Sequence, residues 1–135
     1  FSALVAYDAI HFPAERGRFL ERWIRVPGSW SSAFVEGGSL RGYGVIRRCF
    51  EGFKVGPLFA DTPEIAGRIL EDLTGRDEVR GHLFFLDTPE PNREAVSMAQ
   101  DRQMEEVFGT ARMYTREIPP LPVGRIFGVT TFEMG

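Results

Sequence analysis

The chain has 135 residues, of which 43% are hydrophobic, 13% aromatic and 26% charged, a composition that supports a hydrophobic core and excludes a disordered chain. A net charge of −3 argues against a general nucleic-acid binder, and no apolar run approaches the roughly 20 residues of a membrane span. The single cysteine, Cys49, excludes an internal disulfide and a zinc site built from several cysteines. The sequence shows no signal peptide and begins at Phe1, so we expect one cytoplasmic domain, residues 1–135, that belongs to a longer protein.

The predicted elements alternate between strands and helices from the N-terminus onward. A short apolar run at 3–7 predicts a strand, and Pro13 with the apolar stripe after it predicts a helix that reaches residue 24. Glycine-containing turns then separate three runs that predict strands at 32–36, 40–50 and 53–60. Pro57 lies inside the last strand, and because proline has no N–H group, strand pairing must fail on one side there.

The second half of the chain opens with a strong helix signal. Thr62 can cap a helix whose first turn holds Pro63 and whose end is marked by Gly75. An apolar strand follows at 82–86, Asn92 can cap a helix at 93–108, and two more strands are predicted at 111–115 and 126–133. This order predicts an α/β or α+β sandwich.

Four phrases carry a resemblance that covers nearly the whole chain: GYGVIRRC at 42–49, KVGPLFAD at 54–61, RMYT at 112–115 and FGVTTFEMG at 127–135. In these phrases and their order the chain resembles the GNAT superfamily of acetyl-CoA-dependent N-acetyltransferases. More narrowly, it resembles the GNAT-like C-terminal acetyltransferase domain of tandem GNAT-type proteins. The resemblance implies a mixed, mostly antiparallel sheet of about seven strands, with a splayed central pair and helices on both faces.

The resemblance also implies where acetyl-CoA, the co-substrate, would lie. In GNAT proteins the pantetheine arm enters the gap between the splayed strands as a pseudo-strand, and the pyrophosphate rests on the N-terminus of the next helix. The cofactor-binding residues implied here are Leu58, Phe59, Ala60, Asp61 and Thr62, with Asn92 beside the pantetheine arm. The usual phosphate loop carries Arg or Gln and several glycines, whereas this chain has two acidic residues, Asp61 and Glu64, which would repel a pyrophosphate.

Two residues are candidates for proton transfer. Asp87, at the end of the 82–86 strand, could act as a base for the incoming amine, or it could simply cap a turn. The helix that usually carries the leaving-group tyrosine has none, and Tyr114 is the nearest alternative acid, although a tyrosine on a strand mostly packs. Glu133 could face an acceptor cleft or be a solvated edge carboxylate, and the isolated His11 and His82 form no metal-ligand pattern.

Two functions remain open. The first is an acetyl-CoA-dependent N-acetyltransferase that passes the acetyl group directly to a primary amine of a small acceptor. The alternative is a non-catalytic GNAT-like ligand-binding or interaction module with a degenerate CoA site. The expected partners are a small-molecule amine acceptor and either a second copy of the chain, as a homodimer, or a preceding GNAT domain, with no nucleic acid, membrane or metal.

Overall fold

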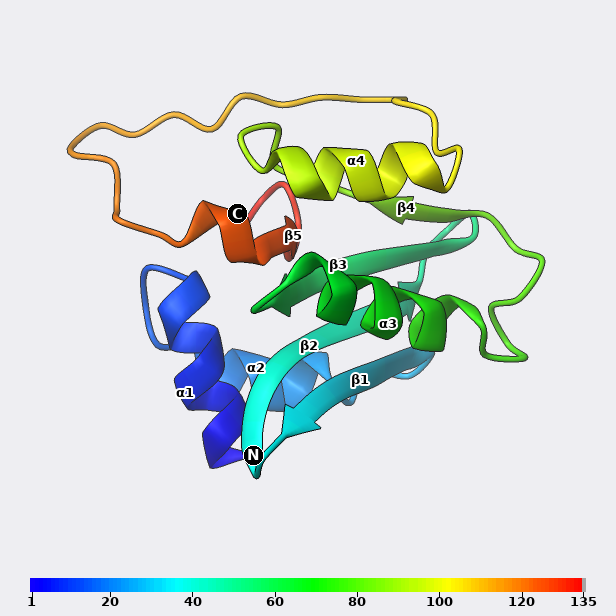
Figure 1. Ribbon diagram of the computed structural model, residues 1–135, viewed down its shortest axis with the longest axis horizontal. Helices are drawn as coiled ribbons and strands as arrows, with labels where there is room; N and C mark the ends of the chain where they lie inside the picture. The colour runs from blue at the N-terminus through cyan, green and yellow to red at the C-terminus, as the bar shows by residue number, and fades with distance from the viewer. Residues whose placement is uncertain (135) are drawn as a thin grey trace.

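The computed structural model describes residues 1–134, which form four α-helices and one five-stranded sheet (Figure 1). The strands are β1 (Ser29–Glu36), β2 (Ser39–Arg48), β3 (Phe53–Ala60), β4 (Phe84–Leu86) and β5 (Ile126–Gly128). All strand pairs are antiparallel except β3–β4, which is parallel. The mixed, mostly antiparallel sheet is therefore as predicted, but it has five strands in the described residues and not about seven.

The central strand β3 has different neighbours along its two halves. Its first half pairs with β4, from Phe53 opposite Phe84 to Val55 opposite Leu86. Its second half pairs with β5, and on its other edge the whole strand is covered by β2. The strands β3 and β4 thus separate after Val55, and β5 lies between them.

The N-terminal region differs from the prediction. Residues 3–7 are not a strand but part of helix α1 (Ser2–His11), and α2 is shorter than predicted, at Gly17–Trp23. A short apolar run fits a buried strand and a buried helix equally well from sequence alone. The helix prevails because Tyr7, Asp8 and His11 are then buried together on one face.

The starts of α3 (Pro63–Thr74) and α4 (Arg93–Asp101), the two helices on the opposite face of the sheet from α1, were predicted correctly. In α3, the Thr62 hydroxyl accepts the Ile65 N–H group, and Gly75 follows the last residue. In α4, the Asn92 side chain is the cap, but the helix stops well before residue 108. Its buried positions end at Met98, and Gln103 has a φ of +57°, which breaks the helix. Residues 111–115 are coil and not the predicted strand.

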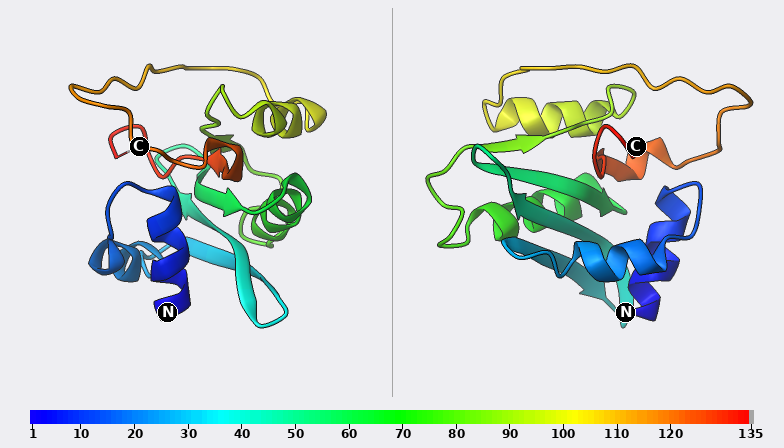
Figure 2. Two further views of the ribbon diagram at one scale, coloured as in Figure 1. Left: turned by 60° about the vertical axis from the view of Figure 1, so that its left-hand side comes forward. Right: turned by 180° about the vertical axis from the view of Figure 1, so that it is seen from behind.

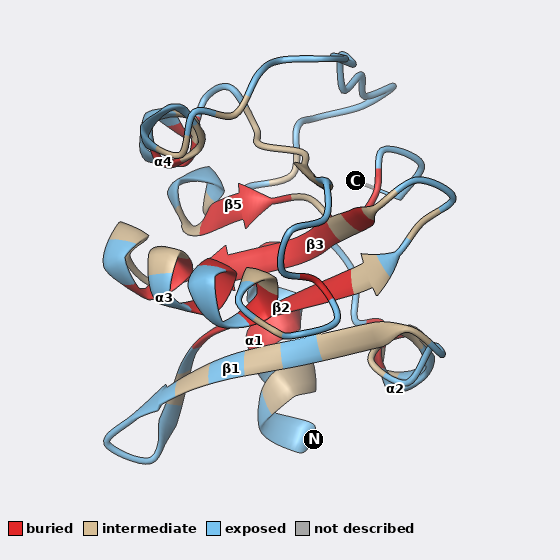
Figure 3. Ribbon diagram, turned by 90° about the vertical axis from the view of Figure 1, so that its right-hand side faces the viewer, coloured by how far each residue is buried: buried red, intermediate tan, exposed pale blue. Residues whose placement is uncertain are grey.

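The sheet separates two hydrophobic cores (Figures 2 and 3). One core lies between the sheet and α3 with α4, and it includes Leu58 and Phe127. The other lies between the sheet and α1 with α2, and it includes Phe59 and Ile126. Helices therefore cover both faces, as predicted, and β5 contributes a side chain to each core.

Candidate functional site

The gap between β3 and β4 is filled by the chain's own C-terminal segment. Leu58 pairs with Gly128 and Phe59 with Ile126, and beyond β5 the Val129 N–H group donates to the Asp87 carbonyl at 2.9 Å. The Gly56–Pro57 peptide, where the prediction placed a break in strand pairing, is cis and lies beside this segment. A Cβ atom on Gly56 would come within 2.5 Å of the Val129 and Thr130 carbonyl oxygens, so only glycine fits there.

This arrangement occupies the backbone that was expected to receive pantetheine. At Leu58 and Phe59, the edge of β3 that faces the gap is already paired with β5. Ala60 pairs with Gly42 of β2 on the opposite edge, and the Asp61 N–H group donates to the Arg41 carbonyl at 2.9 Å. The implied cofactor-binding residues are thus brought together in space, with β5 in the place proposed for the ligand.

Asn92 holds β5 in this position. Its amide nitrogen donates to the carbonyl oxygens of Val123 at 3.1 Å and Ile126 at 2.8 Å, while its amide oxygen accepts the Ala95 N–H group at 3.1 Å. The side chain is almost fully buried. Asn92 therefore ties the start of α4 to the start of β5, where the resemblance implied a contact with the CoA arm.

The N-terminus of α3 satisfies its own donors. Pro63 has no N–H group, and the Ile65 N–H group donates to the Thr62 hydroxyl at 3.3 Å. Hydrogen bonds from its own backbone N–H group and from the Thr62 hydroxyl lower the pKa of the exposed Glu64. The first turn of α3 thus carries the negative charge of Glu64, and its backbone N–H groups donate to the neighbouring Thr62 and Glu64 side chains.

Asp61 was expected to face a pyrophosphate, and instead it is the centre of a local network. Its carboxylate, only 7% exposed, lies 3.1 Å from Arg41 Nη1 and 3.0 Å from Arg125 Nη2, and it accepts the Tyr7 hydroxyl at 2.9 Å. Two arginines therefore neutralise this charge. The contacts join β2, the N-terminus of α3, α1 and the 3-10 turn Val123–Arg125 before β5.

The candidate base Asp87 is paired with a lysine. Its Oδ2 atom lies 2.5 Å from Lys54 Nζ, and both side chains are largely buried. Lys54 also lies over the ring of Phe132, 4.7 Å from its centroid. Asp87 is consequently part of an ion pair that fastens the end of β4 to the start of β3.

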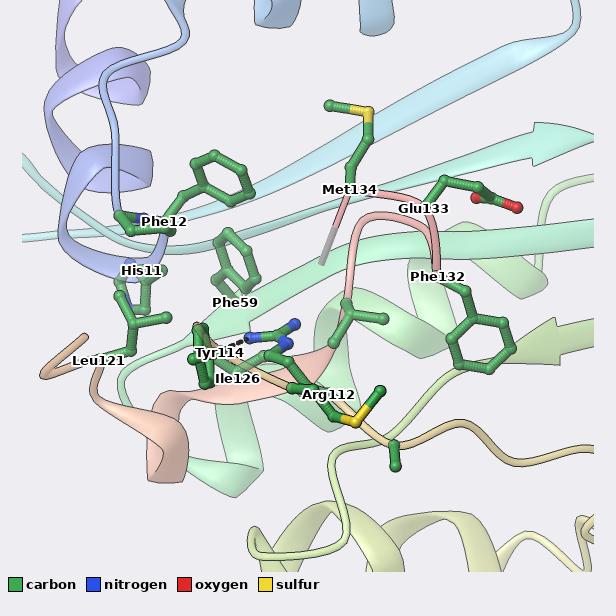
Figure 4. Close-up of a pocket in the computed structure, with 14 residues that line it drawn as sticks. His11, Phe12, Phe59, Arg112, Tyr114, Leu121, Ile126, Phe132, Glu133 and Met134 are labelled. Carbon is green, nitrogen blue, oxygen red and sulfur yellow. Dashed lines mark hydrogen bonds between the residues drawn. The ribbon is translucent and has the colours of Figure 1, made fainter. Parts of the chain in front are cut away.

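The candidate acid Tyr114 lies elsewhere, at a cavity of about 340 Å³ on the α1 side of the sheet (Figure 4). Its hydroxyl accepts a hydrogen bond from Arg112 Nη1 at 3.4 Å. Asp87 does not line this cavity, so the structure does not bring the two candidates for proton transfer together. Glu133 does line it, from the C-terminal segment. The walls come from the end of α1, from β3 and β5, and from the coil segments on either side of β5: His11, Phe12, Phe59, Arg112, Leu121, Ile126 and Val129 among others.

His11, for which the sequence predicted no role, also lines this cavity. Its Nδ1 atom lies 2.8 Å from the Tyr7 carbonyl oxygen, and its ring stacks on Phe59 with 5.0 Å between centroids. Burial is the main cause that lowers the pKa of His11. Its Nε2 atom is buried and has no hydrogen-bond partner among residues 1–134. Tyr7 and His11 are four residues apart, a spacing that brings side chains together only on a helix. Because residues 3–7 were predicted as a strand, the sequence did not indicate this contact.

A buried ion pair joins α1, which carries His11, to the start of α2. Arg16 contacts the fully buried Asp8 through two nitrogen atoms, Nε and Nη2, each at 2.8 Å, and the Tyr43 hydroxyl donates to the same carboxylate. Burial and the Asp8 charge raise the pKa of Tyr43, so its hydroxyl keeps its proton and remains a donor. These contacts attach α1 to β2 and to the start of α2.

Two kinds of site are absent from the part of the chain that the structure describes. Residues 1–134 contain no group of three or more His, Cys, Asp or Glu side chains placed to hold a metal ion. No helix among them is both long enough and apolar enough to cross a membrane.

Comparisons with known proteins agree on the family. The family model of the acetyltransferase (GNAT) domain matches residues 4–128. Holothin acyltransferase of Pseudoalteromonas sp. (strain SANK 73390) is 22% identical over 120 residues, which is 89% of this chain and 40% of that protein. A solved structure from Pyrococcus horikoshii, described as an acetyltransferase, matches all of this chain and 43% of that one, with a TM-score of 0.70 and 21% identity, a level that shows the fold. The chain spans less than half the length of both relatives, and it belongs to the family of GNAT acetyltransferase domains.

Proposed function

We propose that this chain is a ligand-binding GNAT domain that takes part in N-acyl transfer without holding the acyl donor in its own β3–β4 gap. The observation that carries the proposal is the position of β5, which pairs with β3 at Leu58 and Phe59. The positive support is the cavity beside His11, which offers a ligand space on the α1 face of the sheet.

The physical reason is a competition for the same backbone groups. A pantetheine arm that behaves as a strand needs free N–H and C=O groups on the edge of β3. The edge at Leu58 and Phe59 is already paired with β5, and Asn92 holds β5 through two more hydrogen bonds. A donor in the gap would have to displace β5 and leave buried polar groups without partners.

In this proposal the reaction is the one that the family performs. Acetyl-CoA is the co-substrate, and the nitrogen of a primary amine on a small acceptor attacks the thioester carbonyl directly. The C–N bond of the amide forms, the C–S bond breaks, and the proton lost by the amine ends on the CoA sulfur, which leaves as the thiol. The acyl donor is bound outside the β3–β4 gap, by a preceding GNAT domain or by a second copy of the chain. Both relatives are more than twice as long as this chain, which leaves room for such a second site.

A second candidate is that the 135-residue chain catalyses the transfer by itself, with acetyl-CoA in place of β5. The observation that favours it is the shortness of β5, which has three residues and only two register pairs with β3. Asp87 would then be the base, Tyr114 the acid, and Leu58 to Thr62 with Asn92 the donor site.

A thermal-shift titration with acetyl-CoA separates the two candidates. A ligand that binds the folded state raises the melting temperature as its concentration rises. We expect no such rise for the wild-type chain, and a clear, saturable rise would contradict the proposal. The variant Asn92→Asp keeps the oxygen that caps α4 but removes both donors to the β5 side. If the second candidate is right, acetyl-CoA raises the melting temperature of the wild type. The rise is then smaller for Asn92→Asp, which loses the amide that would contact the donor, whereas the exposed amide-to-acid control Gln103→Glu keeps the wild-type rise.

A further inference from the structure

The strand β1 is an edge of the sheet (Figures 1 and 3). It pairs with β2 along its whole length, and no strand among residues 1–134 pairs with its other edge. The Gly28 carbonyl accepts the Arg48 N–H group, and because backbone groups alternate along a strand, the even-numbered residues of β1 face β2. The backbone N–H and C=O groups of Ser31, Ala33 and Val35 therefore point outward from the sheet.

No feature of β1 protects this edge against a further strand. Sheet edges in natural proteins usually carry charged side chains, prolines or bulges, which prevent pairing with another chain. Residues 29–35, SWSSAFV, contain no charged residue and no proline, although 26% of the chain is charged. The one irregularity in the β1–β2 pairing places the extra residue, Arg41, in β2, which leaves β1 regular. The outer edge of β1 is thus open to strand addition.

The sequence of β1 is complementary to itself. Two copies that pair antiparallel around a twofold axis place each residue opposite one that is equally far from the axis on the other side. With Ser32 on the axis, the half-buried Trp30 lies opposite the partner's half-buried Phe34, and by symmetry this aromatic pair forms twice. These are non-hydrogen-bonded positions, where opposite side chains lie closest and aromatic pairs stabilise a sheet. An axis at either neighbouring residue loses both aromatic pairs.

The same register also pairs the outward backbone groups and the charges at the strand ends. Ser31 exchanges both backbone hydrogen bonds with the partner's Ala33, which is likewise an outward-facing residue. Glu36 lies opposite the partner's Gly28, whose neighbour on β2 is the exposed Arg48. Because Gly28 has no side chain, Glu36 can reach the partner's Arg48 across it. Opposite charges therefore meet at both ends of the paired strands.

We propose that two copies of this chain form a symmetric dimer in which their β1 strands pair antiparallel and the two sheets become one continuous sheet. The contact uses the same edge of both copies, so the assembly closes at two. This edge lies at the opposite end of the strand order from β4, with β2 between it and the β3–β4 gap. The inference therefore goes beyond the proposed function and does not rest on it.

Sedimentation equilibrium and amide hydrogen exchange of the 135-residue chain are the first test. We expect the mass to change reversibly from one chain to two as the concentration rises. Above the dimer Kd, the N–H groups of Ser31 and Ala33 should become protected from exchange, whereas in dilute protein they exchange freely. The N–H groups of Trp30 and Ser32 face β2 and should stay protected at both concentrations, which makes them the internal control.

A proline at position 33 tests the backbone pairing. The Ala33 N–H group faces away from β2, so Ala33→Pro removes no hydrogen bond within the chain but removes two from the dimer. We expect the dimer Kd to rise by about tenfold or more, the effect that two backbone hydrogen bonds support. The matched variant Ala33→Val keeps the N–H group and should keep the wild-type Kd.

Charge reversal tests the register independently, and it decides the question if Ala33→Pro does not fold. Glu36 contacts Arg41 of its own chain at 3.8 Å, and both side chains are exposed enough for Glu36 to turn toward the partner's Arg48. Arg48→Glu should raise the dimer Kd roughly three- to tenfold, because two like-charge contacts replace two opposite-charge contacts. The double variant Glu36→Arg with Arg48→Glu should restore the wild-type Kd. Arg18→Glu, an exposed reversal on α2, should leave it unchanged.

A chain that stays monomeric up to its limit of solubility would overturn the proposal. A dimer in which the N–H groups of Ser31 and Ala33 exchange as fast as in the monomer would overturn it too, because that dimer uses another surface. Neither result bears on the closed β3–β4 gap, which the acetyl-CoA titration tests. The two inferences can therefore fail separately.

Discussion

Asp8 is fully buried, and Arg16 is the charge that compensates it. The guanidinium contacts both carboxylate oxygens, and its side chain is itself only 6% exposed. A buried ion pair adds little net stability compared with apolar residues, but removal of one partner leaves an uncompensated charge in the interior. No pattern in the sequence showed this pair, because the two residues lie on opposite sides of the turn after α1 and meet only when that segment is a helix.

We expect Arg16→Met to lower the free energy of unfolding by about 3–5 kcal/mol, since Asp8 then stays buried without its partner. Urea denaturation followed by circular dichroism measures the change. The exposed neighbour Arg18→Met should change stability by no more than about 0.5 kcal/mol. The double variant Asp8→Ala with Arg16→Met should be more stable than Arg16→Met alone, and a strictly additive loss would contradict this account.

His11 makes stability depend on pH. Burial lowers its pKa below the value of about 6.5 for an unfolded chain, so near and below that pH the unfolded state binds a proton more readily than the folded state. Stability due to this group is therefore present above about pH 6.5 and is lost as the pH falls toward the lowered pKa. The slope from this one group cannot exceed about 1.4 kcal/mol per pH unit. Thermal melting can be followed from about pH 7.5 down to about pH 5, a range that spans the pKa of the unfolded-state histidine. Over this range the melting temperature should fall more steeply for the wild type and His82→Phe than for His11→Phe. Parallel curves for all three proteins would show that His11 is not the group responsible.

Among the elements, β3 and α3 could be predicted to the residue, because their signals are local. Thr62, Pro63 and Gly75 mark the helix within one short stretch, and β3 is bounded by Gly52 and by the start of that helix. The apolar run at 3–7 and the RMYT phrase gave wrong predictions, since short apolar runs do not distinguish helix, strand and coil. The position of β5 in the β3–β4 gap could not be predicted, because it depends on contacts between residues about seventy positions apart.

The contact between Gly56 and the segment after β5 can be tested by one methyl group. In Gly56→Ala the new Cβ would lie 2.5 Å from two backbone oxygens, so the backbone must move. We expect a loss of about 1–3 kcal/mol in the free energy of unfolding, as for other overpacked sites. Amide hydrogen exchange should accelerate in β5 more than in β1. Gly124→Ala is the control, because a Cβ there meets nothing within 4 Å, and equal exchange rates in the two variants would contradict the placement of residues 129–130.

At the scale of the whole molecule, the C-terminal segment contributes to both hydrophobic cores, as the central strands β2 and β3 also do. Phe127 is fully buried against the α3 and α4 side, and Ile126 is buried against the α1 and α2 side. Arg125 adds its ion pair with Asp61. The same segment thus closes the gap and stabilises both faces of the sheet, so displacement of β5 by any donor would weaken the fold as a whole.

A chain that ends at Gly124 should therefore be much less stable than the full chain. Burial of an Ile or Phe side chain contributes about 1.5–3 kcal/mol, so loss of both removes about 3–6 kcal/mol from a total that is typically about 5–15 kcal/mol. Urea denaturation should show a midpoint lowered accordingly, whereas a chain that ends at Thr131 keeps β5 and should lose much less. Acetyl-CoA would have to displace β5 to enter the gap, so the same burial energy opposes its binding. This cost corresponds to an affinity for acetyl-CoA that is weaker by a factor of about 10² to 10⁴ than in an open gap. If the chain that ends at Gly124 unfolds within about 1 kcal/mol of the full chain, β5 is an easily released segment, and the gap is open to a donor.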